Sequence, residues 1–259
     1  MFRVPRRAAL LAVGLALVLV APASVSATHS WGGYHWARTS NPFTVKLGDN
    51  VTSAWDSYLA TTSSDWTVPS VLNTSVVPGS APRAKQCQAT AGTVQVCNAT
   101  YGNNGWLGVA SISVTGGTHI SQATVKVNDT YFNTPPYNAP EWRNLVMCQE
   151  VGHALGLDHQ DTDFTNANLG TCMDYTNDPS SNQHPNQHDY AELVTIYAHL
   201  DSTTTLASAT TSKGGPSGNA APAGWGLLVA VTNGGHGATY LLDLGAGNLV
   251  LTHVLWAGR

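Results

Sequence analysis

The stretch MCQEVGHALGLDHQD, residues 147–161, constrains the fold more than any other part of this 259-residue chain. In a helix, positions four residues apart lie on the same face, so Gln149 and His153 share one. Gly156 suits the exit from that helix, because glycine readily adopts the left-handed backbone conformation. A sharp turn there brings His159 back towards His153. The stretch therefore predicts a helix that ends near Gly156 and a chain reversal behind it.

The same stretch carries a chemical pattern. Its two histidines and Glu150 follow the zinc-protease pattern H-E-x-x-H-x-x-G-x-x-H, with Gln149 in place of the first histidine. QEVGHALGLDH thus resembles the zinc-binding motif of the metzincins. Downstream, TCMDY at residues 171–175 resembles the metzincin Met-turn, and residues 184–201 resemble the closing helix of bacterial matrixin-like members. The resemblance covers roughly residues 43–201.

The resemblance implies a secreted zinc-dependent metalloendopeptidase. His153 and His159 would bind one catalytic zinc ion, and Glu150 would be the general base that takes a proton from zinc-bound water. Met173 would form an apolar floor under the zinc. Tyr175 would hydrogen-bond the developing oxyanion.

The expected substrate is a peptide or protein, held in extended form against an edge strand. The resemblance places that edge at residues 118–127 or at the neighbouring strand.

Gln149 leaves the third zinc ligand open, because a catalytic zinc usually has three protein ligands and a water. Gln149 itself is one candidate, through its side-chain oxygen. In a second alternative another residue replaces it, and the candidates are Asp161, Asp163, His119, His184 and His188. In a third the metal keeps two protein ligands, and in a fourth the site is inactive. The remaining histidines have no partners at ligand spacing and are expected to be structural or exposed; they include His35, His199, His236 and His253.

Two functions follow from these alternatives. A buried carboxylate without a partner is costly, so Glu150 beside His153 favours a cation in the site and an active hydrolase. The rival is a catalytically inactive pseudoprotease, a secreted binding module that keeps the fold.

Alternating apolar residues predict strands at residues 43–51, 71–79 and 118–129, and two more between residues 92 and 114. Apolar residues at helical spacing predict helices at residues 51–66, 140–156 and 186–200. With the resemblance, the expected fold is α+β: a twisted, mostly parallel sheet with an N-terminal helix, an active-site helix and a C-terminal helix.

Residues 1–27 have the three parts of a secretory signal peptide. Three arginines precede an apolar run at residues 8–20, and small residues lead to Ala27. The run is shorter than the ~20 residues that a membrane span needs. We therefore expect a secreted, extracellular protein with no membrane contact after the signal is removed.

The mature chain divides by composition. Residues 28–201 form the expected catalytic domain, residues 202–224 a flexible low-complexity linker, and residues 225–259 a small antiparallel β element. Such an element is marginal when alone.

Four cysteines in a secreted chain allow three disulfide pairings. We favour Cys87–Cys97, which closes a local loop. The resemblance favours Cys148–Cys172, which would tie the motif helix to the Met-turn.

The chain carries only 10% charged residues and a net charge of −4, so nothing in the composition indicates a basic nucleic-acid surface, and we expect no nucleic-acid partner. We expect a monomer. A calcium site is a further hypothesis for Asp161 and Asp163 with Asn166 and Asn168, although the spacing is not that of an EF-hand and a surface turn is the simpler interpretation.

Overall fold

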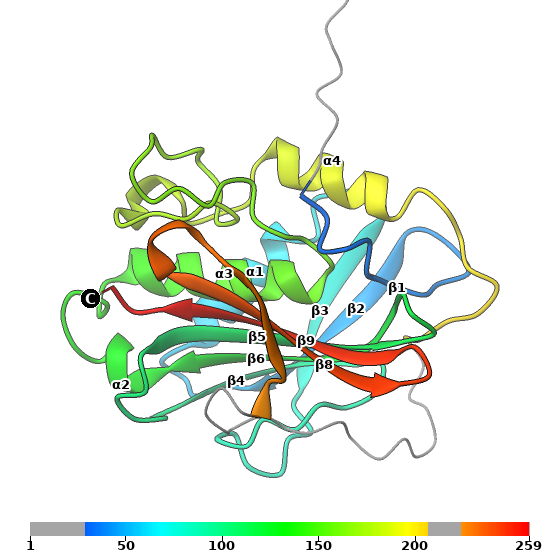
Figure 1. The fold of residues 1–259 in the computed structure, drawn as a ribbon, viewed down its shortest axis with the longest axis horizontal. Helices are drawn as coiled ribbons and strands as arrows, with labels where there is room; N and C mark the ends of the chain where they lie inside the picture. Colours follow the sequence, from blue (N-terminus) through cyan, green and yellow to red (C-terminus); the bar gives the residue numbers. More distant parts are fainter. Residues whose placement is uncertain (1–28, 207–223, 259) are drawn as a thin grey trace, which may run out of the picture.

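The computed structural model describes residues 29–206 and 224–258. The predicted signal peptide and most of the predicted linker lie outside these residues. The described part combines one mixed sheet with helices, as expected for an α+β fold (Figure 1). None of its helices is both long and apolar enough to cross a bilayer.

The sheet has a parallel half and an antiparallel half. Its order is β3-β2-β4-β6-β5-β9-β8-β7, and β1 also pairs with β6. The parallel strands are β1 (His35–Trp36), β2 (Phe43–Asn50), β3 (Leu72–Pro78), β4 (Thr93–Ala99) and β6 (His119–Asn128). The antiparallel strands are β5 (Trp106–Thr115), β7 (Leu227–Val231), β8 (Gly237–Gly245) and β9 (Asn248–Trp256). The expectation of a mostly parallel sheet therefore holds only for the half that β1, β2, β3, β4 and β6 form.

The C-terminal strands do not form a sheet of their own. β9 pairs with β5 from Trp106↔Trp256 to Val114↔Leu249 and so extends the main sheet. Pairing with β5 completes strands that would be marginal alone. One expectation is corrected here: β6 is an interior strand and the free side of its neighbour β5 is taken by β9, so neither is an open edge for a substrate.

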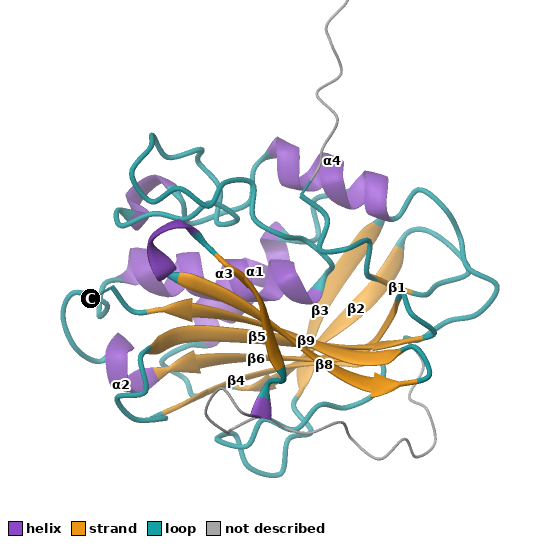
Figure 2. Ribbon diagram, viewed as in Figure 1, coloured by secondary structure: helices purple, strands orange, loops and turns teal. Residues whose placement is uncertain are grey.

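Helices α1 (Asp56–Asp65), α3 (Pro140–Ala154) and α4 (Gln187–Ile196) lie on the same side of the sheet (Figure 2). Pro140 occupies the first turn of α3, where its missing N–H costs nothing. Asn186 and Asp189 form a capping box that begins α4. Three short helical turns complete the described part: α2 (Asp129–Phe132), η1 (Pro179–Ser181) and η3 (Asn233–Gly235).

Two buried tryptophans fix α3 in the core. The Trp66 indole N–H donates to the Cys148 carbonyl at 3.1 Å, and that of Trp36 donates to the Ala154 carbonyl at 2.9 Å. The Ala154 carbonyl belongs to the last turn of α3, where carbonyls lack helical partners.

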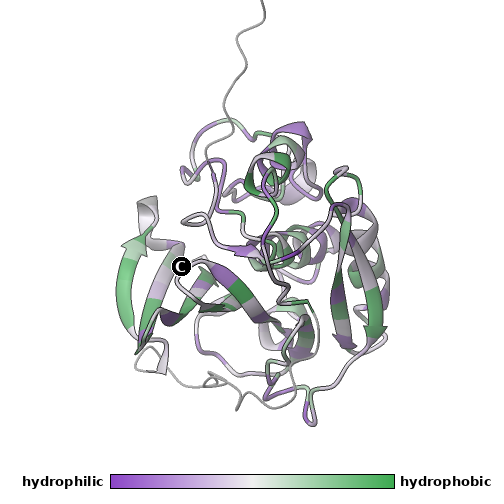
Figure 3. Cartoon of the chain, turned by 90° about the vertical axis from the view of Figure 1, so that its right-hand side faces the viewer, coloured by the Kyte–Doolittle hydropathy of each residue, from purple (hydrophilic) through white to green (hydrophobic). Residues whose placement is uncertain are grey.

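Strand β7 forms one edge of the sheet. Its sequence LLVAV is apolar (Figure 3), yet all five residues are exposed.

Candidate metal centre

Helix α3 carries the motif into the core. Every residue from 145 to 154 is buried, including Gln149, Glu150 and His153. Gly108 on β5 makes room for the glutamate, because a Cβ at Gly108 would lie 2.5 Å from Glu150 Oε1. The glycine on the strand and the carboxylate on the helix are therefore complementary.

Gly156 ends the helix as its sequence position predicts. It has φ +101°, and a Cβ there would overlap the Tyr34 carbonyl oxygen. The next residue, Leu157, forms an isolated bridge with Ser30, and its carbonyl oxygen lies 2.8 Å from His153 Nδ1. A carbonyl only accepts, so Nδ1 carries the hydrogen and leaves Nε2 of the neutral ring with a lone pair.

The chain reversal places His159 beside His153. The segment is held on its other side by the Met-turn, since Gln160 N donates to the Met173 carbonyl at 2.7 Å. The His153 and His159 ring centroids are 4.5 Å apart, and His159 stacks on Tyr175 at 4.0 Å.

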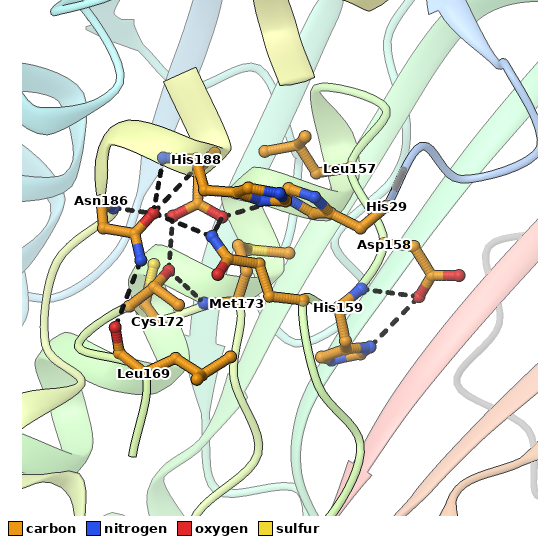
Figure 4. A network of polar contacts seen from close by, with 12 residues as sticks. His29, Leu157, Asp158, His159, Leu169, Cys172, Met173, Asn186 and His188 are labelled. Atoms are coloured by element: carbon orange, nitrogen blue, oxygen red, sulfur yellow. Dashed lines mark hydrogen bonds and ion pairs between the residues drawn. The ribbon is translucent and has the colours of Figure 1, made fainter. Parts of the chain in front are cut away.

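A polar network supports this arrangement from the α4 side (Figure 4). The buried carboxylate of Asp189 lies 3.1 Å from His29 Nε2, accepts from Gln160 Nε2 at 2.9 Å and accepts from the Thr171 hydroxyl. The N-terminal segment, the His159 segment and the Met-turn thus share one anchor at the start of α4.

His253 of β9 also enters the site, which the sequence reasoning missed. Its ring centroid lies 4.2 Å from that of His153 and 4.8 Å from that of His159. Its Nδ1 is 3.3 Å from Glu150 Oε2, and its Nε2 is 2.7 Å from the Tyr175 hydroxyl. The expectation that His253 has no ligand-like partners is therefore wrong. The available signal was its alternation with Leu251 and Leu255, which places a histidine on a strand face that packs into the main core.

Gly237 of β8 faces the site and, like Gly108, leaves no room for a side chain. A Cβ at Gly237 would overlap the hydroxyl of Tyr175. The C-terminal strands are therefore fitted closely around Tyr175 and His253.

The imidazoles of the site are held neutral. Burial lowers the pKa of His153 and of His159 well below the usual value, and the neighbouring histidines lower it further. Burial also lowers the pKa of His253 to about 4. Neutral imidazole is the form that binds zinc.

Glu150 and Tyr175 are shifted the other way. Burial raises the pKa of Glu150 to about 8, although His153 and the Ala110 backbone amide oppose the shift. Burial raises the pKa of Tyr175 well above its ordinary value, and the charge of Glu150 adds to the effect. Both groups hold their protons at neutral pH unless a cation is beside them.

The donor set fits a metal ion. One ligand nitrogen from each of His153, His159 and His253 lies within 4.8 Å of those of the others. Nε2 of His153, Nε2 of His159 and Oε1 of Glu150 are buried with no hydrogen-bond partner in the described residues. Buried polar atoms normally have partners, and zinc would give the two imidazoles theirs.

Gln149, the expected third-ligand position, faces the Met-turn. Its Nε2 donates to the Cys172 carbonyl at 2.9 Å, and its Oε1 is buried without a partner in the described part of the chain. Both disulfides favoured from the sequence are present, and Cys148–Cys172, next to this hydrogen bond, has its Cα atoms 5.9 Å apart.

The other candidates for a third ligand are engaged elsewhere. His184 Nδ1 lies 2.7 Å from Asp65 Oδ2, His188 stacks on His29 at 4.9 Å, and His119 lies 3.3 Å from Asp201 Oδ1. The two acidic candidates accept hydrogen bonds within their own loop, Asp161 from the Asp163 backbone and the Asn166 amide, and Asp163 from Thr165. That loop has the bonding of a surface turn, and nothing in it supports calcium.

A surface cleft of about 570 Å³ is lined by Gly234, His236, Trp256 and Gly258 among others. A narrower cavity shares His236, Trp256 and Gly258 with it and reaches Gln149 and Tyr175. Of the two, only this small cavity, of about 10 Å³, touches residues next to the metal centre.

Gly152 on α3 gives the first test of this packing. A Cβ there would lie 2.5 Å from Met173 Sδ and 2.8 Å from Trp66 Cζ2, and both side chains are fully buried. In an open helix Gly→Ala would stabilise by about 1 kcal/mol. Here we expect Gly152→Ala to destabilise by about 1–3 kcal/mol, because the core is overpacked. Urea unfolding measures the change, and the cost should fall in a Met173→Ala background; a stabilised Gly152→Ala protein would contradict the packing.

Comparisons with known proteins leave the family open. No protein-family model matches the chain, and no curated protein matches it. Among solved structures it is similar to high choriolytic enzyme 1, a hatching enzyme zinc-protease from the medaka fish Oryzias latipes, with 9% identity and a TM-score of 0.34. The match covers 63% of this chain and 94% of that enzyme, and at this TM-score it is too slight to identify a family.

Proposed function

We propose that the chain is a zinc-dependent metalloendopeptidase whose metal is held by His153, His159 and His253. One observation carries the proposal: three buried imidazoles with lowered pKa values converge beside the carboxylate of Glu150. Three histidines are an established ligand set for catalytic zinc. His253 would exchange one of its two present hydrogen bonds for the ion.

Bound there, zinc would supply a Lewis acid that polarises a water molecule and the scissile carbonyl. Glu150 would accept the proton of that water and pass it to the leaving amine. A cation next to Glu150 would bring down its raised pKa and so give it the carboxylate form that a base needs. Tyr175 stays protonated and would donate to the developing oxyanion.

The substrate would enter through the surface cleft rather than along β5. The β5 edge is paired with β9, whereas the cleft shares His236 and Trp256 with a small cavity that touches Tyr175. A peptide there would meet glycine-rich backbone at Gly234 and Gly235.

The rival function is a pseudoprotease that binds a partner without cleaving it. Two observations favour it: Glu150 is fully buried, and β9 covers the strand edge next to the site. The two functions differ in whether loss of Glu150 changes a measurable reaction.

Hydrolysis by the Glu150→Gln variant is the test. We expect the mature wild-type protein, loaded with zinc, to cleave members of a mixed peptide library, and Glu150→Gln to bind zinc but cleave ~10²–10⁴-fold more slowly. No cleavage by the zinc-loaded wild type would favour the binding module, whereas equal cleavage by the two proteins would overturn the role of Glu150 as the base.

We also propose secretion with cleavage after Ala27. N-terminal sequencing of the exported protein tests this, and a mature chain that begins at Thr28 is the expected result.

A further inference from the structure

A second cluster of histidines gathers far from Glu150 in the sequence and shares no residue with the first. We propose that His35, His119, His199 and Asp201 form a second zinc site, which ties the N-terminal segment to the sheet and to the chain beyond α4. The proposal rests on how the backbone brings these four together and on which of their atoms face one another.

The sheet register places two of the ligands side by side. β1 and β6 pair in parallel with His35 opposite His119, and partners in a parallel ladder point to the same side. The His35 and His119 ring centroids are 5.1 Å apart, and the His35 and His199 centroids are 4.6 Å apart. Both pairs are edge-to-face, so neither is held by stacking.

One oxygen of Asp201 faces all three imidazoles. Its Oδ1 lies 3.6 Å from His35 Nε2, 3.3 Å from His119 Nε2 and 3.7 Å from His199 Nε2. His199 Nε2 is also 3.1 Å from His35 Nε2. Ligand atoms about 2.0–2.1 Å from a tetrahedral zinc lie about 3.3 Å apart, so the separations from Asp201 Oδ1 suit one shared ion. His35, His119 and Asp201 offer ligand atoms within 4.8 Å of one another, and His199 adjoins them through His35 and Asp201.

The orientation of His35 suits a metal ligand. His35 Nδ1 lies 2.8 Å from the Gly33 carbonyl oxygen, which only accepts, so Nδ1 donates to it. Nε2 then points to Asp201 Oδ1 at 3.6 Å and to His199 Nε2 at 3.1 Å, and an ion bound there would replace the hydrogen bond between the two imidazoles. A backbone carbonyl on the outer nitrogen is the usual support of a metal-binding histidine.

Arg38 holds the site from behind. It takes the other oxygen of Asp201, with its backbone N–H 3.1 Å and its Nη1 2.9 Å from Oδ2, so Oδ1 alone remains for the ion. The Arg38 guanidinium also donates to the His199 carbonyl. Arg38 is itself buried and lies 4.8 Å from the Tyr197 ring centroid. Arg38 therefore holds the Asp201 carboxylate and the His199 backbone in place without an ion.

The site has an entry path. The His119 and His199 side chains are 30% and 52% exposed, whereas His35 and Asp201 are nearly buried. Zinc from solution can therefore reach three imidazoles and one carboxylate without unfolding the core, and borderline divalent zinc suits that donor set.

Zinc stoichiometry of the mature protein tests the site. The protein is stripped with chelator, titrated with zinc chloride, and its bound zinc is counted by native mass spectrometry. We expect two zinc ions per chain in the wild type. In His119→Asn and in His199→Asn the second ion should bind at least about tenfold more weakly than in the wild type, so that only one ion stays bound at limiting zinc. His184→Asn is the matched control, because His184 is 55% exposed and faces a single carboxylate; it should keep both ions.

The same titration separates this site from the first. His153→Ala should lose one ion and keep the one bound by Asp201 and its histidines. A wild type with one zinc that His199→Asn loses and His153→Ala keeps would support the second site and refute the first. A wild type whose zinc count and affinity are unchanged by His119→Asn and His199→Asn, both folded by circular dichroism, would overturn the second site.

Discussion

Replacing His253 with alanine is expected to lower the zinc content by one ion per chain and peptide hydrolysis by at least roughly 10⁴-fold. His253 is one of three imidazoles that converge beside Glu150, and the other two alone make an incomplete ligand set. A lost Lewis acid removes several kcal/mol of transition-state stabilisation, and each 1.36 kcal/mol is tenfold in rate. Metal analysis and a fluorogenic peptide assay measure the two effects.

Two further variants show whether His253 acts as a ligand. His184→Ala should match the wild type in both assays, because His184 lies at the surface beside Asp65. Gln149→His in the His253→Ala background should regain part of the zinc, because it restores an imidazole one helical turn before His153. If His253→Ala keeps all its zinc and cleaves faster than the wild type, then β9 is a cover and Gln149 completes the site.

The parts of the site that sequence could predict depend on local rules. The helix of the motif, its end at Gly156 and the return of His159 follow from spacing and from the freedom of one glycine. The start of α4 follows likewise from Asn186 and Asp189, three residues apart. In each case the residues that decide the geometry are neighbours in the chain.

The third imidazole could not be predicted in the same way. Glu150 and His253 are 103 positions apart, and a low-complexity segment lies between them. No local rule says that β9 pairs with β5, because any alternating strand is compatible with any open edge. The sequence offered only a weak signal, a histidine in the apolar phase of Leu251 and Leu255.

The second histidine cluster could not be predicted either, because its residues also meet only through long-range strand pairing. His35 and His119 become neighbours only through the parallel register of β1 and β6, and β1 is two residues long. A strand that short has no periodicity to detect. Asp201 joins them because its backbone N–H donates to the Arg38 carbonyl at 2.9 Å, a contact between residues 163 positions apart in the sequence.

A chain that ends at residue 206 is expected to lose the metal centre and most of its stability. Removal of β9 exposes the β5 edge and uncovers Leu107, Ile112 and their neighbours in the core. The lost strand itself buries Val250, Leu251, Val254 and Leu255, and about 2 kcal/mol for each gives roughly 8 kcal/mol. That is comparable with the whole net stability of a typical domain, ~5–15 kcal/mol.

The truncation decides between two roles for the C-terminal strands. If they complete the fold and supply a ligand, the shortened chain should aggregate or unfold at low urea concentration, bind no zinc beside Glu150 and cleave nothing. If they cover a site that is otherwise complete, it should stay folded and cleave peptides faster. Substitution of Leu227 and Val229 by threonine is the control, since both are more than half exposed on β7 and should change stability by less than about 0.5 kcal/mol. We expect the first outcome, because Gly237 and His253 fit too closely around Tyr175 and Glu150 for a removable cover.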